Sequence, residues 1–191
     1  MKRRRLAPDA RREEILAAAE RLLRRDATAD VRVDDVVREA RAAKGTFYLY
    51  FESWEELLLA LRERAFARFD ELYPSPAHPA AIADWRRLAE KMAVGFVDFT
   101  LSLGGLHRAI FHGALEPLPA HGGAIGRIAD LIDAGMKAGA FAETDARLVA
   151  RFLFAMLHEA VDAIEAGENR ARVLRTVRQM LARCLAPESS A

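Results

Sequence analysis

Small, polar and phenolic side chains follow one another closely over residues 44–50, which read Lys-Gly-Thr-Phe-Tyr-Leu-Tyr. A helix that enters the major groove of DNA needs small or polar side chains at its N-terminal end, because that end meets the edges of the bases. Gly45 lets the backbone approach closely, and Lys44 can reach a guanine edge or a phosphate. Thr46 offers a hydroxyl and a methyl group, and the Tyr48 hydroxyl can meet a phosphate. These residue types in this order indicate a helix that contacts DNA.

A helix-turn-helix is expected to hold this segment in place. Apolar residues recur at helical spacing over residues 10–25, 33–40 and 44–50, which predicts three helices. The stretch Arg-Ala-Ala joins the second helix to the third, and two short helices joined by about three residues have the spacing of a helix-turn-helix. Phe47 and Phe51 are interpreted as core residues that pin the third helix onto the other two.

Further helices are predicted along the rest of the chain. Ser53 and Glu56 stand at the spacing of a capping box, which starts a long helix that ends by Pro74. The chain contains 38 Ala and 25 Arg, both good helix formers, and shows no strand pattern. The fold class is therefore predicted to be all-α, with about nine helices. The later helices are expected over residues 80–103, 106–112, 124–138, about 145–166 and 169–186, with Thr144 or Asp145 and then Asn169 as N-caps.

The charge is unevenly distributed along the chain. The formal net charge is +1, but residues 1–51 carry 13 basic and 9 acidic groups, whereas residues 52–191 carry 16 and 19. The first part is therefore +4 and the remainder −3. This difference favours an anionic partner for the N-terminal part, with a solvated basic tail as the alternative.

Cysteine content and hydropathy narrow the class of protein. No apolar stretch approaches about 18 residues, so no membrane partner is expected. The first residues carry charge without an apolar region of the kind that a signal peptide needs. The single cysteine, Cys184, allows no internal disulfide, which fits a cytoplasmic location. We interpret it as a small apolar filler rather than a redox sensor.

One motif and its distance from the next helix point to a family. The residues that carry it are Lys44-Gly45-Thr46-Phe47-Tyr48-x-Tyr50-Phe51, then Ser53-x-Glu55-Glu56-Leu57-Leu58. Together with Val36-x-x-Glu39-Ala40 and Ile15-Leu16-x-Ala18-Ala19 upstream, this pattern resembles the TetR family of transcriptional regulators. The resemblance covers residues 10–66, and beyond them the chain matches the family only in helical architecture.

The resemblance implies a homodimer that binds double-stranded DNA at a pseudo-palindromic operator and responds to a small-molecule effector. It implies a helix-turn-helix DNA-binding domain over residues 9–69, with the helix-turn-helix itself at 32–51. An effector-binding and dimerisation domain would follow over residues 70–187. No cofactor, metal or catalytic residue is expected. The basic N-terminal arm would add sequence-independent contacts. The residues expected to contact DNA, by position in the motif, are Arg32, Lys44, Gly45, Thr46, Phe47, Tyr48 and Tyr50.

The chain departs from the family pattern at three positions. Arg41 replaces a glycine that often needs a positive φ, which costs a non-glycine residue about 1 kcal/mol. Ala43 replaces a serine whose side chain caps the next helix, a contribution of roughly 1 kcal/mol. Trp54 replaces a lysine that contacts phosphate, and it is expected to pack on the sugar-phosphate backbone or on Phe51 instead. These departures bear on DNA affinity and operator sequence rather than on the class of protein.

Aromatic residues in the C-terminal half suit a pocket for a hydrophobic small molecule. For each of them the alternative is a purely structural place in the core. His158 and Asp162 lie on one helix face, but a metal site would need His107 or His112 as a third ligand, so we expect no metal. The residues expected to contact the effector are Trp85, Phe96, Phe99, His107, Phe111, Phe154 and His158.

The last two helices are amphipathic and joined by a tight turn at Gly167. Such an antiparallel pair buries a remaining apolar face best against a copy of itself, in a two-fold four-helix bundle. Internal packing of this face is the alternative. The residues expected at the dimer interface are Phe152, Met156, Val173, Val177 and Leu181.

The sequence thus predicts a transcriptional repressor that a small hydrophobic effector releases from its operator. An activator, or a regulator of the same fold that responds to no ligand, is the alternative. A small all-α enzyme has little support, because no nucleophile elbow, phosphate loop or metal signature appears.

Overall fold

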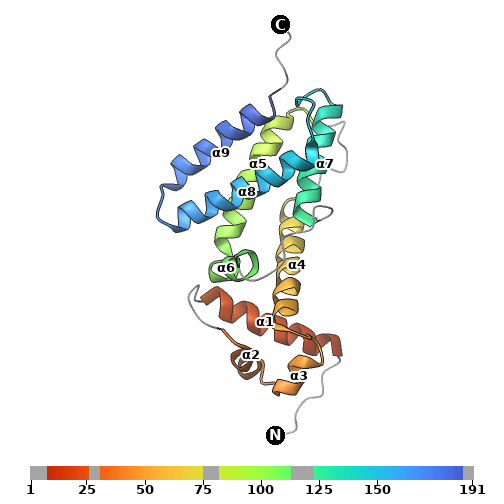
Figure 1. Cartoon of the computed structure of the whole chain (residues 1–191), viewed down its shortest axis with the longest axis vertical. Coiled ribbons are helices and arrows are strands. Elements are labelled where there is room, and N and C mark those ends of the chain that lie inside the picture. The colour runs from red at the N-terminus through yellow and green to blue at the C-terminus, as the bar shows by residue number, and fades with distance from the viewer. Residues whose placement is uncertain (1–7, 26–30, 75–81, 113–122, 187–191) are drawn as a thin grey trace. The chain divides into compact units, whose positions relative to one another are not determined.

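The computed structural model describes residues 8–25, 31–74, 82–112 and 123–186. These residues form α-helices and the turns between them, and no β-strand occurs among them. The predicted all-α fold class is confirmed. The nine helices of the described residues are labelled in Figure 1. They are α1 (Pro8–Arg25), α2 (Val33–Glu39), α3 (Lys44–Tyr48), α4 (Trp54–Leu72), α5 (Trp85–Ser102), α6 (Gly105–Phe111), α7 (Gly123–Lys137), α8 (Ala146–Glu165) and α9 (Arg170–Cys184).

The chain divides into two compact units. The N-terminal unit comprises Met1–Ala65 and Leu103–Glu116, and the C-terminal unit comprises Phe66–Ser102 and Pro117–Ala191. The start of α4 therefore belongs to one unit and its end to the other. The sequence places α6 after the expected boundary at residue 70, whereas the packing groups it with the N-terminal unit. The predicted pair of independent domains stays a prediction.

The N-terminal unit is built around α1. Both α2 and α6 pack against α1, and α3 packs against α2. The helices of this unit bury apolar residues that recur along one face of the helix. The tight core explains how a five-residue helix such as α3 holds its place. Its fully buried side chains include Ile15, Leu16, Phe47, Phe51, Leu57 and Leu61.

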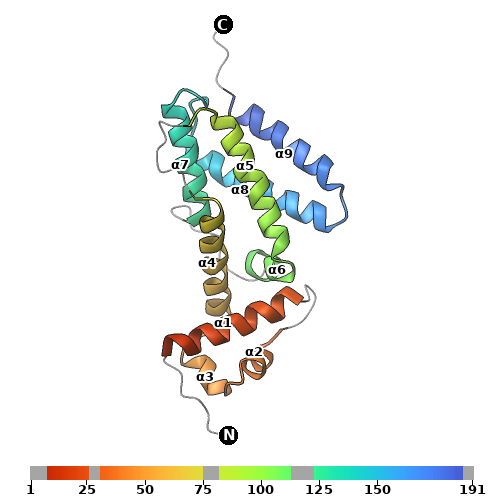
Figure 2. The ribbon, with the colours of Figure 1, turned by 180° about the vertical axis from the view of Figure 1, so that it is seen from behind.

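The C-terminal unit is built around α8. This helix packs against α5, α7 and α9, and α5 also packs against α9. The helices α8 and α9 form an antiparallel pair, and Figure 2 shows α5 crossing in front of α8. Because α8 has neighbours on three sides, one stripe of its surface faces away from the core. That stripe and the interior between the helices are the two features of this unit that bear on function.

Helix ends in the C-terminal unit follow their predicted caps. The Asp145 carboxylate accepts a hydrogen bond from the Leu148 N–H at 3.0 Å, so Asp145 rather than Thr144 caps α8. The Asn169 side chain caps α9 in the same way. Gly139 and Gly167 have φ values of +69° and +102°, a region that suits glycine at the end of a helix.

One predicted helix start is wrong. The sequence predicts a helix from residue 80, but α5 begins at Trp85 and the described residues just before it are not helical. The Asp84 carboxylate accepts the Arg87 N–H at 2.9 Å, which satisfies one of the free donors at the helix start. Apolar periodicity continues through Ile82 and therefore could not reveal this stop.

Two further observations complete the description. None of the helices formed by the described residues is both long and apolar enough to cross a membrane. The basic N-terminal arm, at residues 2–5, lies outside the described residues.

Candidate DNA-binding surface and effector cavity

The turn between α2 and α3 has the backbone conformation that the family pattern requires. Arg41 has a φ of +51°, the only positive value at a non-glycine residue in the described chain. The Ala42 N–H donates to the Val37 carbonyl at 2.8 Å, which closes the turn. Ala43 is the N-cap of α3 and supplies no side-chain hydrogen bond. The two departures predicted to weaken this turn, at Arg41 and Ala43, are thus present in the structure.

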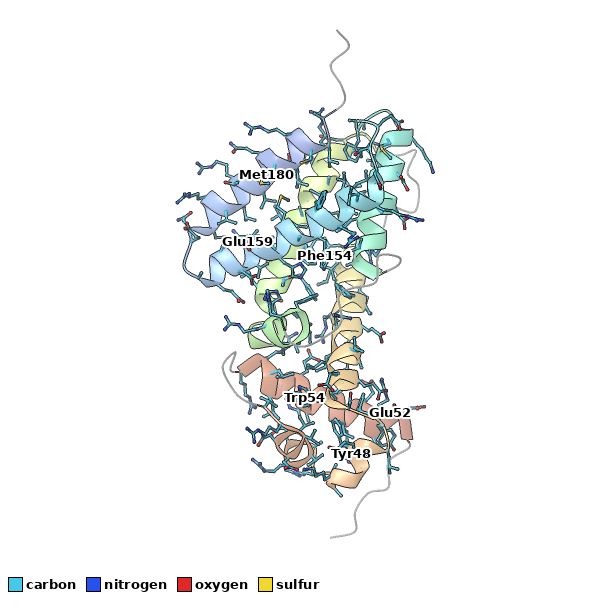
Figure 3. The ribbon with its side chains drawn as sticks, viewed as in Figure 1. Tyr48, Glu52, Trp54, Phe154, Glu159 and Met180 are labelled. Atoms are coloured by element: carbon cyan, nitrogen blue, oxygen red, sulfur yellow. The ribbon has the colours of Figure 1, made fainter. Side chains whose placement is uncertain are left out.

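The helix α3 presents most of its predicted contact residues to the surface. Lys44 and Gly45 are exposed, Tyr48 is 52% exposed, and Thr46 and Tyr50 are half-buried. Figure 3 shows Tyr48 on this short helix. A Cβ added to Gly45 would meet nothing within 4 Å. A side chain at position 45 would therefore not clash with the rest of the chain. If glycine is required there, the reason is close contact with a binding partner.

Phe47 does not belong to this surface. Its side chain is fully buried, and its ring lies 5.2 Å from that of Tyr48 and 5.6 Å from that of Phe51. The prediction that Phe47 contacts DNA is therefore wrong for its side chain, and its interpretation as a core residue is right. The Arg12 guanidinium lies 5.0 Å from the centre of the Phe51 ring. These contacts fix the buried side of α3 and hold Tyr48 outward.

Acidic residues of α2 organise the basic groups around α3. The Lys44 ammonium lies 2.9 Å from the Asp34 carboxylate, and this hydrogen bond and the attraction between the charges raise the pKa of Lys44. The Asp35 carboxylate accepts the Arg32 N–H at 3.1 Å and pairs with Arg38 at 2.8 Å. The hydrogen bond from the Arg32 backbone is the main reason that the pKa of Asp35 is lowered.

Asp34 and Asp35 were not among the predicted site residues. Their position in the first turn of α2 suits the positive end of a helix, and that was the only sequence signal available. Arg32, which was predicted, is the exposed N-cap residue of α2.

The start of α4 differs from the predicted capping box in one bond. The Glu56 N–H donates to the Ser53 hydroxyl at 3.1 Å, as predicted. The Glu56 carboxylate, however, accepts from the Glu52 N–H rather than from that of Ser53. Trp54, the first residue of α4, is half-buried (Figure 3). The N-terminus of α4 is therefore capped by two hydrogen bonds, of which one differs from the predicted capping box.

The C-terminal unit contains a cavity of about 230 Å³. Its walls are mainly aromatic and aliphatic side chains, and its charged lining residues are Asp70, Arg127 and Asp130. Cavities of this composition bind small apolar ligands. The lining residues, from α4, α5, α7, α8, α9 and the turns beside them, include Phe66, Phe69, Trp85, Met92, Phe96, Ile128, Phe141, Leu153, Leu157, Leu181 and Leu185.

The cavity includes two of the seven predicted effector residues. Trp85 and Phe96 line it. Phe154 and His158 lie behind the wall instead, with their rings 5.7 Å and 5.1 Å from that of Phe96. Phe99 likewise packs on the lining residue Phe69, at 5.5 Å. These three residues support the cavity rather than line it.

His107 and Phe111 are not part of the cavity. Both belong to the N-terminal unit, where His107 is fully buried and its ring lies 5.4 Å from that of Phe111. The prediction that they contact an effector in this cavity is wrong. Their helix, α6, packs on α1 because the chain turns at Gly104, whose φ is +58°. An aromatic pattern along the sequence could not reveal that turn.

The predicted dimer residues fall into two groups. Val177 and Leu181 are 3% and 4% exposed and pack inside the chain's own core, so they are not available to a partner and this prediction is wrong. Met156 and Val173 are half-buried, and Phe152 is 64% exposed. Sequence analysis missed Leu148 and Met180, each 45% exposed. The helical period revealed apolar faces but not which of them turns inward.

Comparison with known proteins relates part of the chain to a family of regulators. The family model for bacterial regulatory proteins of the tetR family matches residues 15–61, which contain α2, α3 and the turn between them. This N-terminal part of the chain is therefore similar to that family. The matched residues hold both the exposed side of α3 and the core beneath it. The rest of the chain lies outside the match, so its similarity must come from other comparisons.

Curated transcriptional regulators match the chain over part of its length. It is 39% identical over 102 residues to the HTH-type transcriptional regulator EthR of Mycobacterium tuberculosis (strain ATCC 25618 / H37Rv), which covers 53% of this chain and 45% of that protein. It is 42% identical over 110 residues to EthR of Mycolicibacterium smegmatis, which covers 58% and 48%. The matched part of the chain thus spans about half the length of these relatives.

Solved structures share the fold along nearly the whole chain. A TetR-family transcriptional regulator from Pectobacterium atrosepticum has a TM-score of 0.73 and 24% identity, covering 96% of this chain and 98% of that one. The structure of RolR in complex with resorcinol has a TM-score of 0.72 and 17% identity, covering 95% and 90%. At these identities the likeness establishes the fold of both units and no particular ligand.

Proposed function

We propose that this protein is a DNA-binding transcriptional repressor that a small apolar effector releases from its operator. The observation that carries the proposal is the exposed side of α3, with Lys44, Thr46 and Tyr48 held outward by a buried Phe47. The apolar cavity in the C-terminal unit of the same chain supports the effector part. The relatives are transcriptional regulators, and RolR binds resorcinol.

DNA recognition would use α3 in the major groove. Lys44 offers a cation for a guanine edge or a phosphate, Tyr48 a hydroxyl for a phosphate, and Thr46 a hydroxyl and a methyl group. In the free protein Lys44 is held by Asp34. Binding therefore exchanges one ion pair for another, which favours a site that offers Lys44 a well-placed acceptor. Contacts to phosphate would make the affinity fall as salt rises.

The dimer would form on the outer faces of α8 and α9. Leu148, Phe152 and Ala155 are exposed and three to four residues apart, so they share one face of α8, opposite its buried residues. Met180 of α9 is likewise exposed, and Figure 3 labels it beside Glu159 of α8. Burial of this stripe against its copy would form a two-fold interface. The two recognition helices could then meet successive major grooves about 34–36 Å apart.

Effector action would be a shift between two arrangements of the dimer. A ligand that binds the released arrangement more tightly lowers DNA affinity by that difference in binding free energy. An activator, or a regulator that responds to no ligand, would share the DNA surface but would not show this release.

Selection of bound duplexes from a random pool tests the proposal. A palindromic consensus should emerge, and fluorescence anisotropy should show tighter binding to it than to random duplex, with an affinity that falls as salt rises. Equal affinity for consensus and random duplex would contradict the proposal. Phe152→Glu should give a monomer in analytical ultracentrifugation and weaken operator binding. Leu72→Glu, at another exposed leucine, should leave the dimer intact.

A further inference from the structure

The cavity of the C-terminal unit carries one cluster of charged side chains on an otherwise apolar wall. Asp70 comes from α4, and Arg127 and Asp130 come from adjacent turns of α7. The Arg127 side chain is 24% exposed and that of Asp70 is 45% exposed. A guanidinium at an apolar cavity would ordinarily suggest an anionic ligand, such as a carboxylate. The contacts of Arg127 argue otherwise.

Arg127 already has partners within its own unit. One Nη atom forms an ion pair with the Asp70 carboxylate, and Nη2 donates to the Tyr73 carbonyl at 3.0 Å. Burial lowers the pKa of the Arg127 guanidinium. The group stays charged, because an arginine guanidinium is not deprotonated in proteins. The cavity therefore presents a matched ion pair, with the exposed Asp130 carboxylate beside it.

We propose that the cavity binds an uncharged apolar molecule that carries one hydroxyl or carbonyl group, held by the Arg127–Asp70 pair. A hydroxyl can donate to the Asp70 carboxylate and accept from Arg127 while the pair stays intact. A carboxylate would have to displace Asp70 or lie against it and Asp130. An ammonium would lie against Arg127. Either ion would leave one charge poorly matched inside an apolar cavity, which is unfavourable.

The size of the cavity limits the ligand further. Its volume of about 230 Å³ exceeds the roughly 150 Å³ of an apolar cavity that holds one benzene molecule, so it has room for somewhat more than six carbon atoms. An eight-carbon chain or a substituted single ring meets that limit. The aromatic walls, which include Trp85 and Phe96, suit either shape. The inference rests on the proposed function in one respect, since the ligand is taken to be its effector.

Three probes with the same chain and different end groups test the inference without DNA. Octanol, octanoate and octylamine are titrated at pH 7 into the full chain with Trp54→Phe, which leaves Trp85 as its one tryptophan. Calorimetry and Trp85 fluorescence both report binding. We expect octanol to bind at least about tenfold more tightly than either ion, since a mismatched charged group costs that much or more. Tighter binding of octanoate or octylamine, or no binding of octanol, would overturn the inference.

Two variants should reverse this preference in opposite directions. Asp70→Asn leaves the Arg127 cation without its carboxylate, and octanoate should then bind best. Arg127→Met leaves Asp70 without its cation, and octylamine should then bind best. Asp133→Asn removes a carboxylate of the same helix that does not line the cavity, and it should keep the wild-type order. An unchanged order in both cavity variants contradicts the inference.

Folding and function are separated by two further measurements. Asp70→Glu keeps the carboxylate and should keep the preference for octanol, even if Asp70→Asn proves unstable by circular dichroism. Octanol binding without release of operator DNA would preserve this inference and contradict the effector part of the proposed function. Release of DNA by an anion or a cation, with no octanol binding, would support the effector part of the proposed function and contradict this inference.

Discussion

The two units of the protein form their sites in different ways. In the N-terminal unit the candidate DNA surface is local: Lys44, Thr46 and Tyr48 lie within five residues on one short helix, α3. In the C-terminal unit the cavity draws its lining from residues as distant as Phe66 and Leu185. A local site follows from helical spacing, whereas a distributed cavity depends on how several helices pack. The first is therefore readable from sequence, and the second becomes visible only in the fold.

The largest effect should come from the local site. Lys44→Ala combined with Tyr48→Phe removes two exposed polar contacts, each worth about 1–3 kcal/mol, so operator affinity should fall about thirtyfold or more. Anisotropy measures this loss. Binding of octanol in the C-terminal unit should stay unchanged. Lys91→Ala removes an equal charge from an exposed position on α5 and should barely alter DNA affinity. A double variant that binds like wild type would refute the assignment of these residues.

The same contrast explains how far the sequence predicts the structure. The motif at 44–58 predicts α3, its turn and the start of α4, and Asp145, Asn169 and Gly167 mark helix ends correctly. These features depend on residues close together in the chain. The prediction failed at Phe47, because position in a family motif does not distinguish a residue that faces DNA from one beneath the surface.

Prediction of the cavity failed for a tertiary reason. Trp85 and Phe96 were found because aromatic residues at helical spacing mark an apolar face. Asp70 and Arg127 were missed because their pairing joins α4 to α7, 57 positions apart in sequence. No local pattern links two such residues. The sequence therefore supplies the hydrophobic character of the ligand site but not its polar contacts.

The next largest effect is expected from a substitution of one glycine, Gly135, beside the cavity of the C-terminal unit. A Cβ added to Gly135 would lie 2.1 Å from the ring of Phe141, which lines the cavity. Gly135→Ala must displace that ring and should destabilise the C-terminal unit by about 1–3 kcal/mol and weaken octanol binding. Urea unfolding and calorimetry measure both. At Gly126 on the same helix a Cβ meets nothing within 4 Å, so Gly126→Ala should be neutral or stabilising. Equal effects of the two changes would contradict this account.

A smaller effect of opposite sign is expected in the N-terminal unit. Arg41 holds a φ of +51°, which costs a residue with a side chain about 1 kcal/mol. Arg41→Gly should therefore stabilise the fold by up to about 1 kcal/mol in urea unfolding. Arg41→Ala removes the same charge and keeps the strain, so it should bring no such gain. If both variants gain stability equally, charge rather than backbone strain explains the change.

The smallest effect concerns Asp35, whose carboxylate lies in the first turn of α2. Asp35 has a lowered pKa, first because the Arg32 N–H donates to it, so its contribution to stability is present above its ordinary pKa of about 4 and is lost as the pH falls through the lowered value. Asp35→Asn should be less stable than wild type at pH 7, and urea unfolding should show the two converge as the pH falls below the ordinary pKa of the carboxyl group. Arg38→Gln keeps the backbone hydrogen bond and should have the lesser effect. If the difference in free energy of unfolding between wild type and Asp35→Asn does not change with pH, the loss of stability comes from the shape of the side chain rather than from its charge. The difference between the two units would then be smaller, because the N-terminal site would depend on side-chain packing, as the cavity does.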